Sequence, residues 1–196
     1  GQDTIATNYT SHAEGTGTEA TGYTAHAEGN KTKSQGPGSH AEGSETVAGS
    51  ACSHAEGEKT KAMGANSHTE GKETEAIGDG AHAEGMGTVA VFNYQHVEGK
   101  YNIKDNSSSG KYVHIVGNGY SDTTRSNAHT IDWNGVGWFK SGLKIGGNGQ
   151  DDTAAVEVAT KIDIDNTIGR KGTGENAEIF NDYTNNQATG AFSHAE

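Results

Sequence analysis

The sequence predicts an all-β solenoid of stacked 14-residue coils, and three repeating features lead to this prediction. Seven histidines recur every 14 residues from His12 to His96. Each is followed two places later by a glutamate and three places later by a glycine, most often within the string SHAEG. A threonine recurs six places after the histidine, from Thr18 to Thr88. A fixed period in sequence indicates a fixed structural unit that stacks on copies of itself.

The composition agrees with a repeat architecture. Of 196 residues, 30 are glycine, 30% are hydrophobic and 7% are aromatic, which is too few large apolar side chains for an ordinary globular core. Strict periodicity nevertheless argues against disorder, because backbone ladders between identical coils replace part of such a core. The net charge of −12 argues against nucleic acid as a partner. No apolar run approaches the ~18 residues of a membrane span, so we expect no membrane insertion.

Alternation within one unit predicts which side chains lie inside the coil. In an extended segment Ser11 and Ala13 share one face, and His12 and Glu14 share the other. In the second half of the unit, Thr18 falls in phase with an alanine and a glycine. Each coil is therefore predicted to contain two short strands, joined by turns that glycine permits, around a narrow interior of small residues.

The outward positions are of two kinds. The seventh place after the histidine varies freely between acidic, basic and apolar residues, as on a solvated face (Glu19, Lys33, Val47, Lys61, Glu75, Val89). The histidine and glutamate positions never vary, and a face that repeats identically is best matched by another copy of itself in a symmetric oligomer. We therefore predict an interface ladder made of His12, Glu14, His26, Glu28, His40, Glu42, His54, Glu56, His68, Glu70, His82, Glu84, His96 and Glu98.

Metal binding and catalysis are the alternatives for these residues. Zinc requires about four ligands that converge on one point, whereas coils that rise by ~4.8 Å place histidine and glutamate in a ladder. Three-fold symmetry would still bring three imidazoles together, which leaves a metal site as an alternative. Acid–base catalysis is disfavoured because active sites are singular and this arrangement occurs seven times. We predict hydrogen-bonded His–Glu pairs, no catalytic residue, no cofactor and no metal.

The repeat resembles the head domain of YadA-like trimeric autotransporter adhesins. That family repeats S-V-A-I-G-x-x-S-x-A-x-G, and residues 1–99 repeat S-H-A-E-G-x-x-T-x-A-x-G. The resemblance implies a left-handed parallel β-roll that assembles as a homotrimer. Histidine and glutamate stand where the family has valine and isoleucine. Similar SHAEG arrays occur in tail-fibre proteins of phages and prophages of Gram-positive bacteria.

Beyond Gly99 the periodicity stops and larger residues become frequent. Residues 104–110 (KDNSSSG) are predicted to form a polar loop, and residues 111–117 (KYVHIVG) a strand. A further strand is expected at 143–146. Residues 152–162 are expected to form a short helix or a strand, with the helix favoured.

A hairpin is the clearest local prediction in this half. Asn134-Gly135 separates two alternating runs, which is typical of a type I′ turn. The hairpin should bring Trp133 and Trp138 together as the apolar core of a small β-rich insert domain. Residues 126–147 also resemble a module of phage tail-fibre proteins, SNAHTLDWSGNAWFAG. His129 and Asp132 have no nucleophile placed beside them by a motif, so we expect a structural histidine rather than a catalytic pair.

The chain is expected to contain a β-roll over 1–99, a β-rich insert over 100–178 and the start of a second roll over 179–196. Gly1 and residues 193–196 both fall inside the repeat, so we expect a segment of a longer modular protein.

These features predict a structural, non-enzymatic fibre module of a phage or phage-like tail fibre, which is extracellular or part of the virion. A trimeric adhesin on the bacterial surface is the alternative. A glycan-depolymerising tailspike is disfavoured because it needs paired carboxylates in a groove lined by aromatic residues. The expected partner is a second and third copy of the chain. A cell-surface receptor or glycan is left open as a further partner, with the loop 118–125 and the variable face of the roll as candidate contacts.

Overall fold

The computed structural model describes residues 1–141, 144–145 and 156–157. The chain divides into two units, Gly1–Ser141 and Gly142–Glu196. In the second unit the described residues are strands β18 (Lys144–Ile145) and β19 (Val156–Glu157), which pair antiparallel. The strand predicted over 143–146 is thus confirmed at its described residues. The helix favoured over 152–162 is wrong at 156–157, where the chain is extended.

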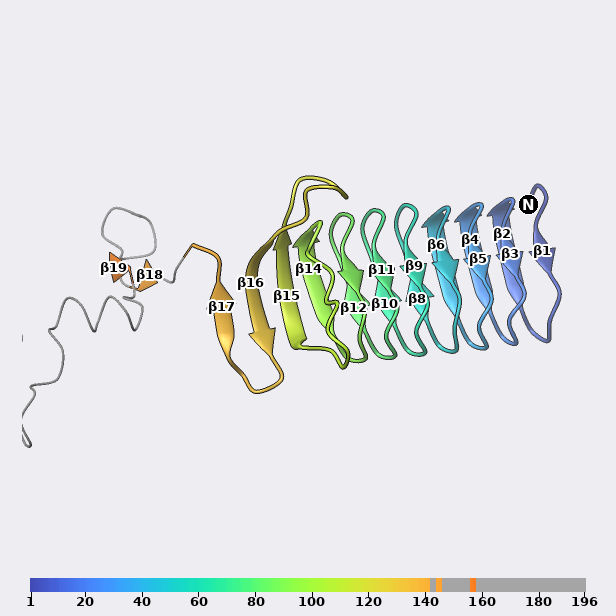
Figure 1. Ribbon diagram of the computed structural model, residues 1–196. Coiled ribbons are helices and arrows are strands. Elements are labelled where there is room, and N and C mark those ends of the chain that lie inside the picture. Colours follow the sequence, from blue (N-terminus) through green and yellow to red (C-terminus); the bar gives the residue numbers. More distant parts are fainter. Residues whose placement is uncertain (142–143, 146–155, 158–196) are drawn as a thin grey trace, which may run out of the picture. The chain divides into compact units, whose positions relative to one another are not determined.

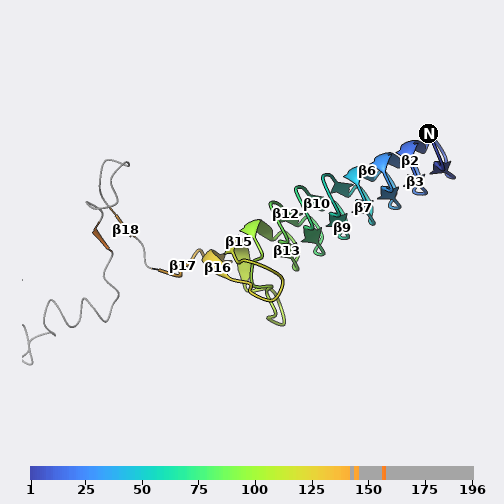
Figure 2. The same cartoon turned by 90° about the horizontal axis from the view of Figure 1, so that it is seen from above.

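The first unit is a parallel β-solenoid, as the repeat predicted, and the described residues contain no helix. Successive coils follow one another from β2 to β15 in Figure 1. Two sheets run along the solenoid, and Figure 2 shows their strands as two rows. One sheet, which we call the histidine sheet, has ten strands, and the second sheet has seven.

The first strand of each coil belongs to the histidine sheet. These strands are β2 (His12–Thr16), β4 (His26–Asn30), β6 (His40–Ser44), β8 (His54–Ala55), β10 (His68–Thr69), β12 (His82–Ala83), β14 (His96–Lys100) and β15 (Tyr112–Asn118). Two antiparallel strands complete this sheet beyond β15, namely β16 (Asn127–Asp132) and β17 (Gly137–Phe139). The second sheet contains β1 (Ile5–Ala6), β3 (Glu19–Ala20), β5 (Lys33–Ser34), β7 (Val47–Ala48), β9 (Lys61–Ala62), β11 (Glu75–Ala76) and β13 (Val89–Ala90).

The interior is as narrow as the alternation predicted. Equivalent residues of adjacent coils pair in register, so that Ala27 faces Ala41 and Ala62 faces Ala76. All of these alanines and the threonines of the repeat are buried. The hydroxyl of Thr60 donates to the carbonyl oxygen of Glu56 at 3.0 Å, and equivalent bonds recur in the next two coils, so these threonines link the two halves of a coil.

Glycine has a different role from the one predicted. The left-handed turn positions are filled mostly by other residues, such as Thr24, Cys52 and Glu73, at φ between 52° and 56°. The glycine of SHAEG is needed for stacking instead. A Cβ added at Gly43, where φ is +104°, would overlap the carbonyl oxygen of Gly57 in the next coil. Glycine therefore permits the close approach of backbones, and the same overlap recurs from Gly15 to Gly99.

The solenoid continues for one coil beyond the end of the sequence period. β15 confirms the strand predicted at 111–117, and it pairs parallel with β14 so that His114 faces His96 and Gly117 faces Gly99. The predicted loop at 104–110 contains no strand. The carboxylate of Asp105 organises it, because it accepts hydrogen bonds from the backbone N–H groups of Ser107, Lys111 and Tyr112.

The predicted hairpin is formed by β16 and β17, but its turn is not type I′. Within the turn only Gly135 has a positive φ, and the carboxylate of Asp132 accepts hydrogen bonds from the N–H groups of Asn134 and Val136. The N–H of Asp132 donates to the carbonyl of Val136, which closes a three-residue loop, and within it the N–H of Gly135 donates to the carbonyl of Asp132. Among the described residues the aromatic contact of Trp138 is with Tyr112, not with Trp133.

The two tryptophans do not form a core within the protomer. Trp133 is 50% exposed and Trp138 is 42% exposed. Trp138 makes an edge-to-face contact with Tyr112, at 5.9 Å between ring centroids. β15, β16 and β17 belong to the same sheet as the roll, within the unit 1–141. The proposed boundaries at 178/179, and the return of the repeat near the end of the chain, lie outside the described residues.

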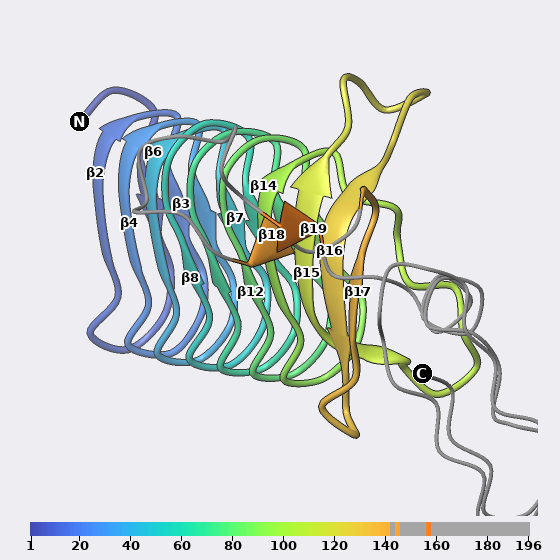
Figure 3. The same ribbon diagram turned by 90° about the vertical axis from the view of Figure 1, so that its left-hand side faces the viewer.

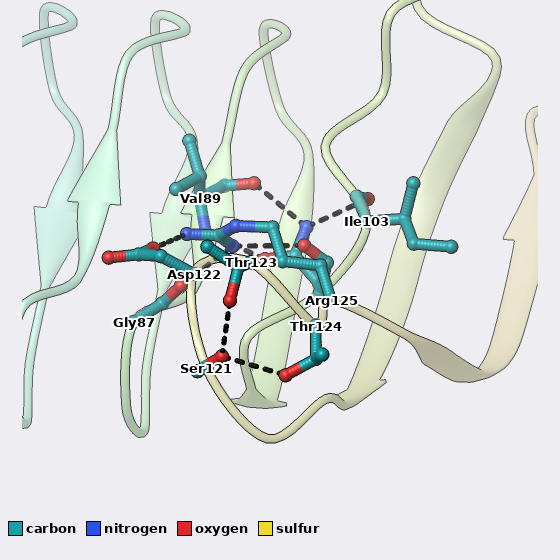
Figure 4. A network of polar contacts seen from close by, with 9 residues as sticks. Gly87, Val89, Ile103, Ser121, Asp122, Thr123, Thr124 and Arg125 are labelled. Carbon is teal, nitrogen blue, oxygen red and sulfur yellow. Dashed lines mark hydrogen bonds and ion pairs between the residues drawn. The ribbon is translucent and has the colours of Figure 1, made fainter.

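A side-chain cap ends the second sheet after β13 (Figure 4). The amide side chain of the buried Asn102 makes the two backbone hydrogen bonds that a further strand would make with Val89. Its Oδ1 accepts from the N–H of Val89 at 2.8 Å, and its Nδ2 donates to the carbonyl of Val89 at 3.1 Å. Arg125 lies in the loop between β15 and β16 and holds this cap in place. Its Nη1 donates to the carbonyl oxygens of Gly87 and Asn102, and its Nη2 pairs with Asp122.

Substitution of Asn102 by alanine tests this cap. We expect Asn102→Ala to lower the free energy of unfolding by about 2–4 kcal/mol, because it leaves two buried backbone groups of Val89 without partners. The urea midpoint of the circular dichroism signal measures the effect. Asn118→Ala, at an exposed position of β15, is the matched control. Equal midpoints for the two variants would show that the side chain of Asn102 does not cap the sheet.

Candidate interface: the histidine and glutamate columns

The structure brings all fourteen residues of the predicted ladder to one face of the molecule. They lie on the outer face of the histidine sheet, because the residue between each His and Glu points into the interior. This residue is alanine in five coils, Thr69 in one and Val97 in another, and from the second coil onward it is buried. Figure 3 shows the strands that carry them side by side. The imidazole rings of successive coils stack from His12 to His96, with centroids 4.7–4.9 Å apart and planes within 14° of parallel.

From Glu42 onward, each glutamate lies beside the histidine of the following coil. From β8 onward the Nε2 atom of a histidine faces a carboxylate oxygen of the preceding coil, as in His54–Glu42 at 3.4 Å and His96–Glu84 at 3.0 Å. In the first two coils the nearest carboxylate belongs to the same coil, at 3.9 Å. The His96–Glu84 contact is a hydrogen bond, whereas the longer contacts are ion-pair distances that do not meet hydrogen-bond geometry.

Five histidines therefore have an unsatisfied nitrogen. Their Nε2 atoms are buried within the protomer and have no hydrogen-bond partner among the described residues (His26, His40, His54, His68, His82). Buried polar atoms in folded proteins are nearly always paired, and carboxylate oxygens of the glutamate column lie 3.4–3.7 Å from three of these nitrogens. The same arrangement recurs in consecutive coils along one line.

The stack disfavours protonation of four of its histidines. Desolvation lowers the pKa of His40, His68, His82 and His114 below the ordinary value of 6.5, and the neighbouring imidazoles of the stack lower it further. The adjacent glutamates act in the opposite direction, but the burial and the like charges outweigh them.

The carboxylates form a column of their own. A shared proton with Glu42 raises the pKa of Glu28 above 4.5, and burial together with the contact to Glu42 raises that of Glu56. Glu28 and Glu56 therefore hold protons more tightly than an isolated glutamate. Beside this column runs a shallow groove of about 330 Å³, with Glu14, Glu28 and Glu42 on its wall and the glycines of the same strands as its floor.

The geometry within one protomer does not converge on a metal ion. Four groups bring three His and Glu ligand atoms within 4.8 Å of one another, for example His40, Glu42 and His54. The rings of His40 and His54 are parallel within 3°, so the lone pairs on their Nε2 atoms run side by side rather than toward one point. A tetrahedral site needs donors aimed at a common centre about 2.0 Å away. The stacked arrangement suits hydrogen bonding better.

Sequence reasoning missed four residues that extend this face. His114 continues the stack at 5.2 Å from His96, and His129 follows at 5.8 Å from His114. Phe139 then stacks on His129 at 4.4 Å. Val116 takes the place of the glutamate, opposite Glu98. The string VHIVG at 113–117 corresponds to SHAEG, but it lies four residues out of phase with the 14-residue period and differs from SHAEG at three of five positions.

The other predicted residues are placed as follows. The carboxylate of Asp132 accepts a hydrogen bond within the hairpin turn, and the ring of His129 stacks on that of Phe139. Both contacts agree with the structural roles expected for these residues. The variable column lies on the second sheet, where Lys33 and Glu19 form an ion pair at 3.0 Å. The loop 118–125 is anchored by Arg125 and exposes Tyr120. No helix in the described part of the chain is long and apolar enough to cross a membrane.

Fold and site together define a parallel β-solenoid with one invariant polar face. Comparison with protein-family models, with curated proteins and with solved structures finds no match for the chain.

Proposed function

We propose that the chain is a structural module of a phage or phage-like tail fibre, in which three copies form a left-handed β-roll trimer through the His–Glu ladder. The observation that carries this proposal is the identical repetition of histidine and glutamate on one outer face, where the seven imidazoles stack in register from His12 to His96. A second and third copy, placed against the same face, would cover these columns in every coil at once. The variable outer face of the second sheet would remain in solvent.

The contrast between the two outer faces supports self-association. An interface for an unrelated partner has no reason to repeat identically in seven coils, whereas a symmetry-related copy repeats with the same spacing. The resemblance of residues 126–147 to a tail-fibre module favours the tail fibre over a surface adhesin.

Immunogold labelling distinguishes these two locations. We expect label on the tails of particles, and label on the cell envelope without particles would favour the adhesin.

Light scattering tests the assembly. We expect a molar mass three times that of the 20.3 kDa protomer. The double variant Glu56→Lys/Glu70→Lys should reduce the mass to that of one protomer. It removes two carboxylates that face His68 and His82, and it places positive charges of the three copies beside one another where the copies meet. Glu75→Lys is the matched control on the second sheet and should remain a trimer. A monomeric wild-type protein, or equal masses for both variants, would contradict the proposal.

A further inference from the structure

The outer face of the histidine sheet changes its chemistry at one end. In the register of the sheet, Val116 stands opposite Glu98 and pairs on its other side with His129, which in turn pairs with Phe139. His114 pairs with Ile131. Directly paired side chains of a sheet lie on the same face, so Val116, Ile131 and Phe139 continue the face of the ladder. We call these three residues the apolar end.

Within the part of the chain that the structure describes, the apolar end is only partly covered. Phe139 is 44% exposed although its ring stacks on that of His129, and Val116 and Ile131 are partly exposed. The opposite face of the same strands behaves differently. Ile115 and Thr130 are buried there, and Trp138 packs against Tyr112 with the Nζ of Lys111 at 4.8 Å from its indole ring. Trp138 is nevertheless 42% exposed on that face, so both faces of β17 carry an exposed aromatic ring, and Phe139 is the one on the ladder side.

The ladder alone cannot define how the copies are aligned along the solenoid. Every coil offers the same histidine and the same glutamate, so a copy displaced by one coil meets almost the same partners. Register in sheets is weakly specified wherever the residues do not differ from one position to the next. An element that occurs once is needed to distinguish the correct alignment from the displaced ones, as single distinctive residues do in coiled coils.

We propose that the apolar end is the contact that fixes this alignment, and that its occupant is the apolar end of the other two copies. This inference rests on the trimer proposed above. It commits to a second copy because the apolar end is continuous with the ladder, and a copy that docks on the ladder in register places its own Val116, Ile131 and Phe139 against these residues. Displacement by one strand would set Phe139 against β16 of another copy, where His129 stands in the same row, instead of against a second Phe139.

The first experiment measures assembly of the full chain. We expect Phe139→Asp to weaken trimer formation at least 100-fold in sedimentation equilibrium, while the circular dichroism spectrum stays unchanged. Phe139→Leu should assemble like the wild type, because it keeps the apolar contact. Trp138→Ser is the matched control, since it removes an exposed aromatic ring from the other face of the same strand.

The second experiment measures alignment by disulfide formation. In a Cys52→Ala background, protomers with Glu70→Cys should cross-link to one another, because equivalent coils meet. A mixture of Glu56→Cys and Glu70→Cys protomers should give few mixed dimers in the wild-type sequence and at least ten-fold more when Phe139→Asp is added. If Phe139→Asp abolishes assembly altogether, the contact is confirmed by the first experiment.

Two outcomes distinguish the role of the apolar end from the existence of the trimer. A wild-type protein that sediments as a monomer contradicts the trimer itself. A wild-type trimer whose affinity and cross-linking pattern are both unaffected by Phe139→Asp overturns the role of the apolar end and leaves the ladder as the interface.

Discussion

Replacing Gly43 by alanine is expected to lower the free energy of unfolding by more than about 3 kcal/mol. The added Cβ would overlap the carbonyl oxygen of Gly57, and the φ of +104° is strained for any other residue. Overpacking of this kind costs about 1–3 kcal/mol and backbone strain about the same again. Because both coils are held by neighbours on either side, neither can move away. Urea denaturation followed by circular dichroism measures the loss.

The turn glycine Gly38 provides the control. Its φ of +66° lies in the left-handed region, as do those of Thr24, Cys52 and Asn66 in the equivalent turns, at 52–56°. A Cβ at this position meets no atom closer than the Sγ of Cys52 at 3.6 Å. We expect Gly38→Asn to change the free energy of unfolding by less than about 1 kcal/mol, since asparagine tolerates this conformation. If both variants unfolded at the same urea concentration, glycine would be required by the turns rather than by the stacking.

The repeated half of the fold could be predicted from the sequence because each of its interactions is made between equivalent positions. The 14-residue period gives the parallel register, and the alternation around His12 gives the buried alanines and the exposed ladder. The role of Gly43 could not be predicted in the same way. A glycine that serves a turn and a glycine that serves close stacking have the same periodicity, and only the distance between coils distinguishes them.

The end of the solenoid could not be predicted because its contacts join positions that the repeat does not relate. Asn102 looks like a loop residue in the sequence, although it completes the edge of β13, and Arg125 reaches back 38 residues to Gly87. The strand of His114 differs from the repeat at most positions. Phe139 reaches the ladder face only through an antiparallel hairpin. The alternation within 129–140 predicts that hairpin without showing which face it continues.

Acidification from pH 8 to pH 5 is expected to destabilise the roll. The folded pKa values of His40, His68, His82 and His114 lie below 6.5, so the unfolded chain binds protons first as the pH falls. The stability that these groups contribute is complete above pH 6.5 and is lost as the pH falls through their folded pKa values. Glu28 and Glu56 have raised pKa values and act in the opposite direction, but closer to pH 4.5.

The size of the effect follows from the spacing of the stack. Two unit charges 4.8 Å apart, as in the rings of His40 and His54, repel by about 1 kcal/mol even in bulk water. A few protonated neighbours should therefore lower the melting temperature by roughly 10 °C.

In the double variant His68→Gln/His82→Gln the dependence of the melting temperature on pH should be shallower, because glutamine keeps a hydrogen-bond donor but does not titrate. Melting curves that coincide at pH 8 and pH 5 would mean that the imidazoles accept protons in the folded state as readily as in the unfolded chain. The ladder would then be fully paired by its carboxylates, and burial at a trimer interface would no longer explain why histidine is repeated in every coil.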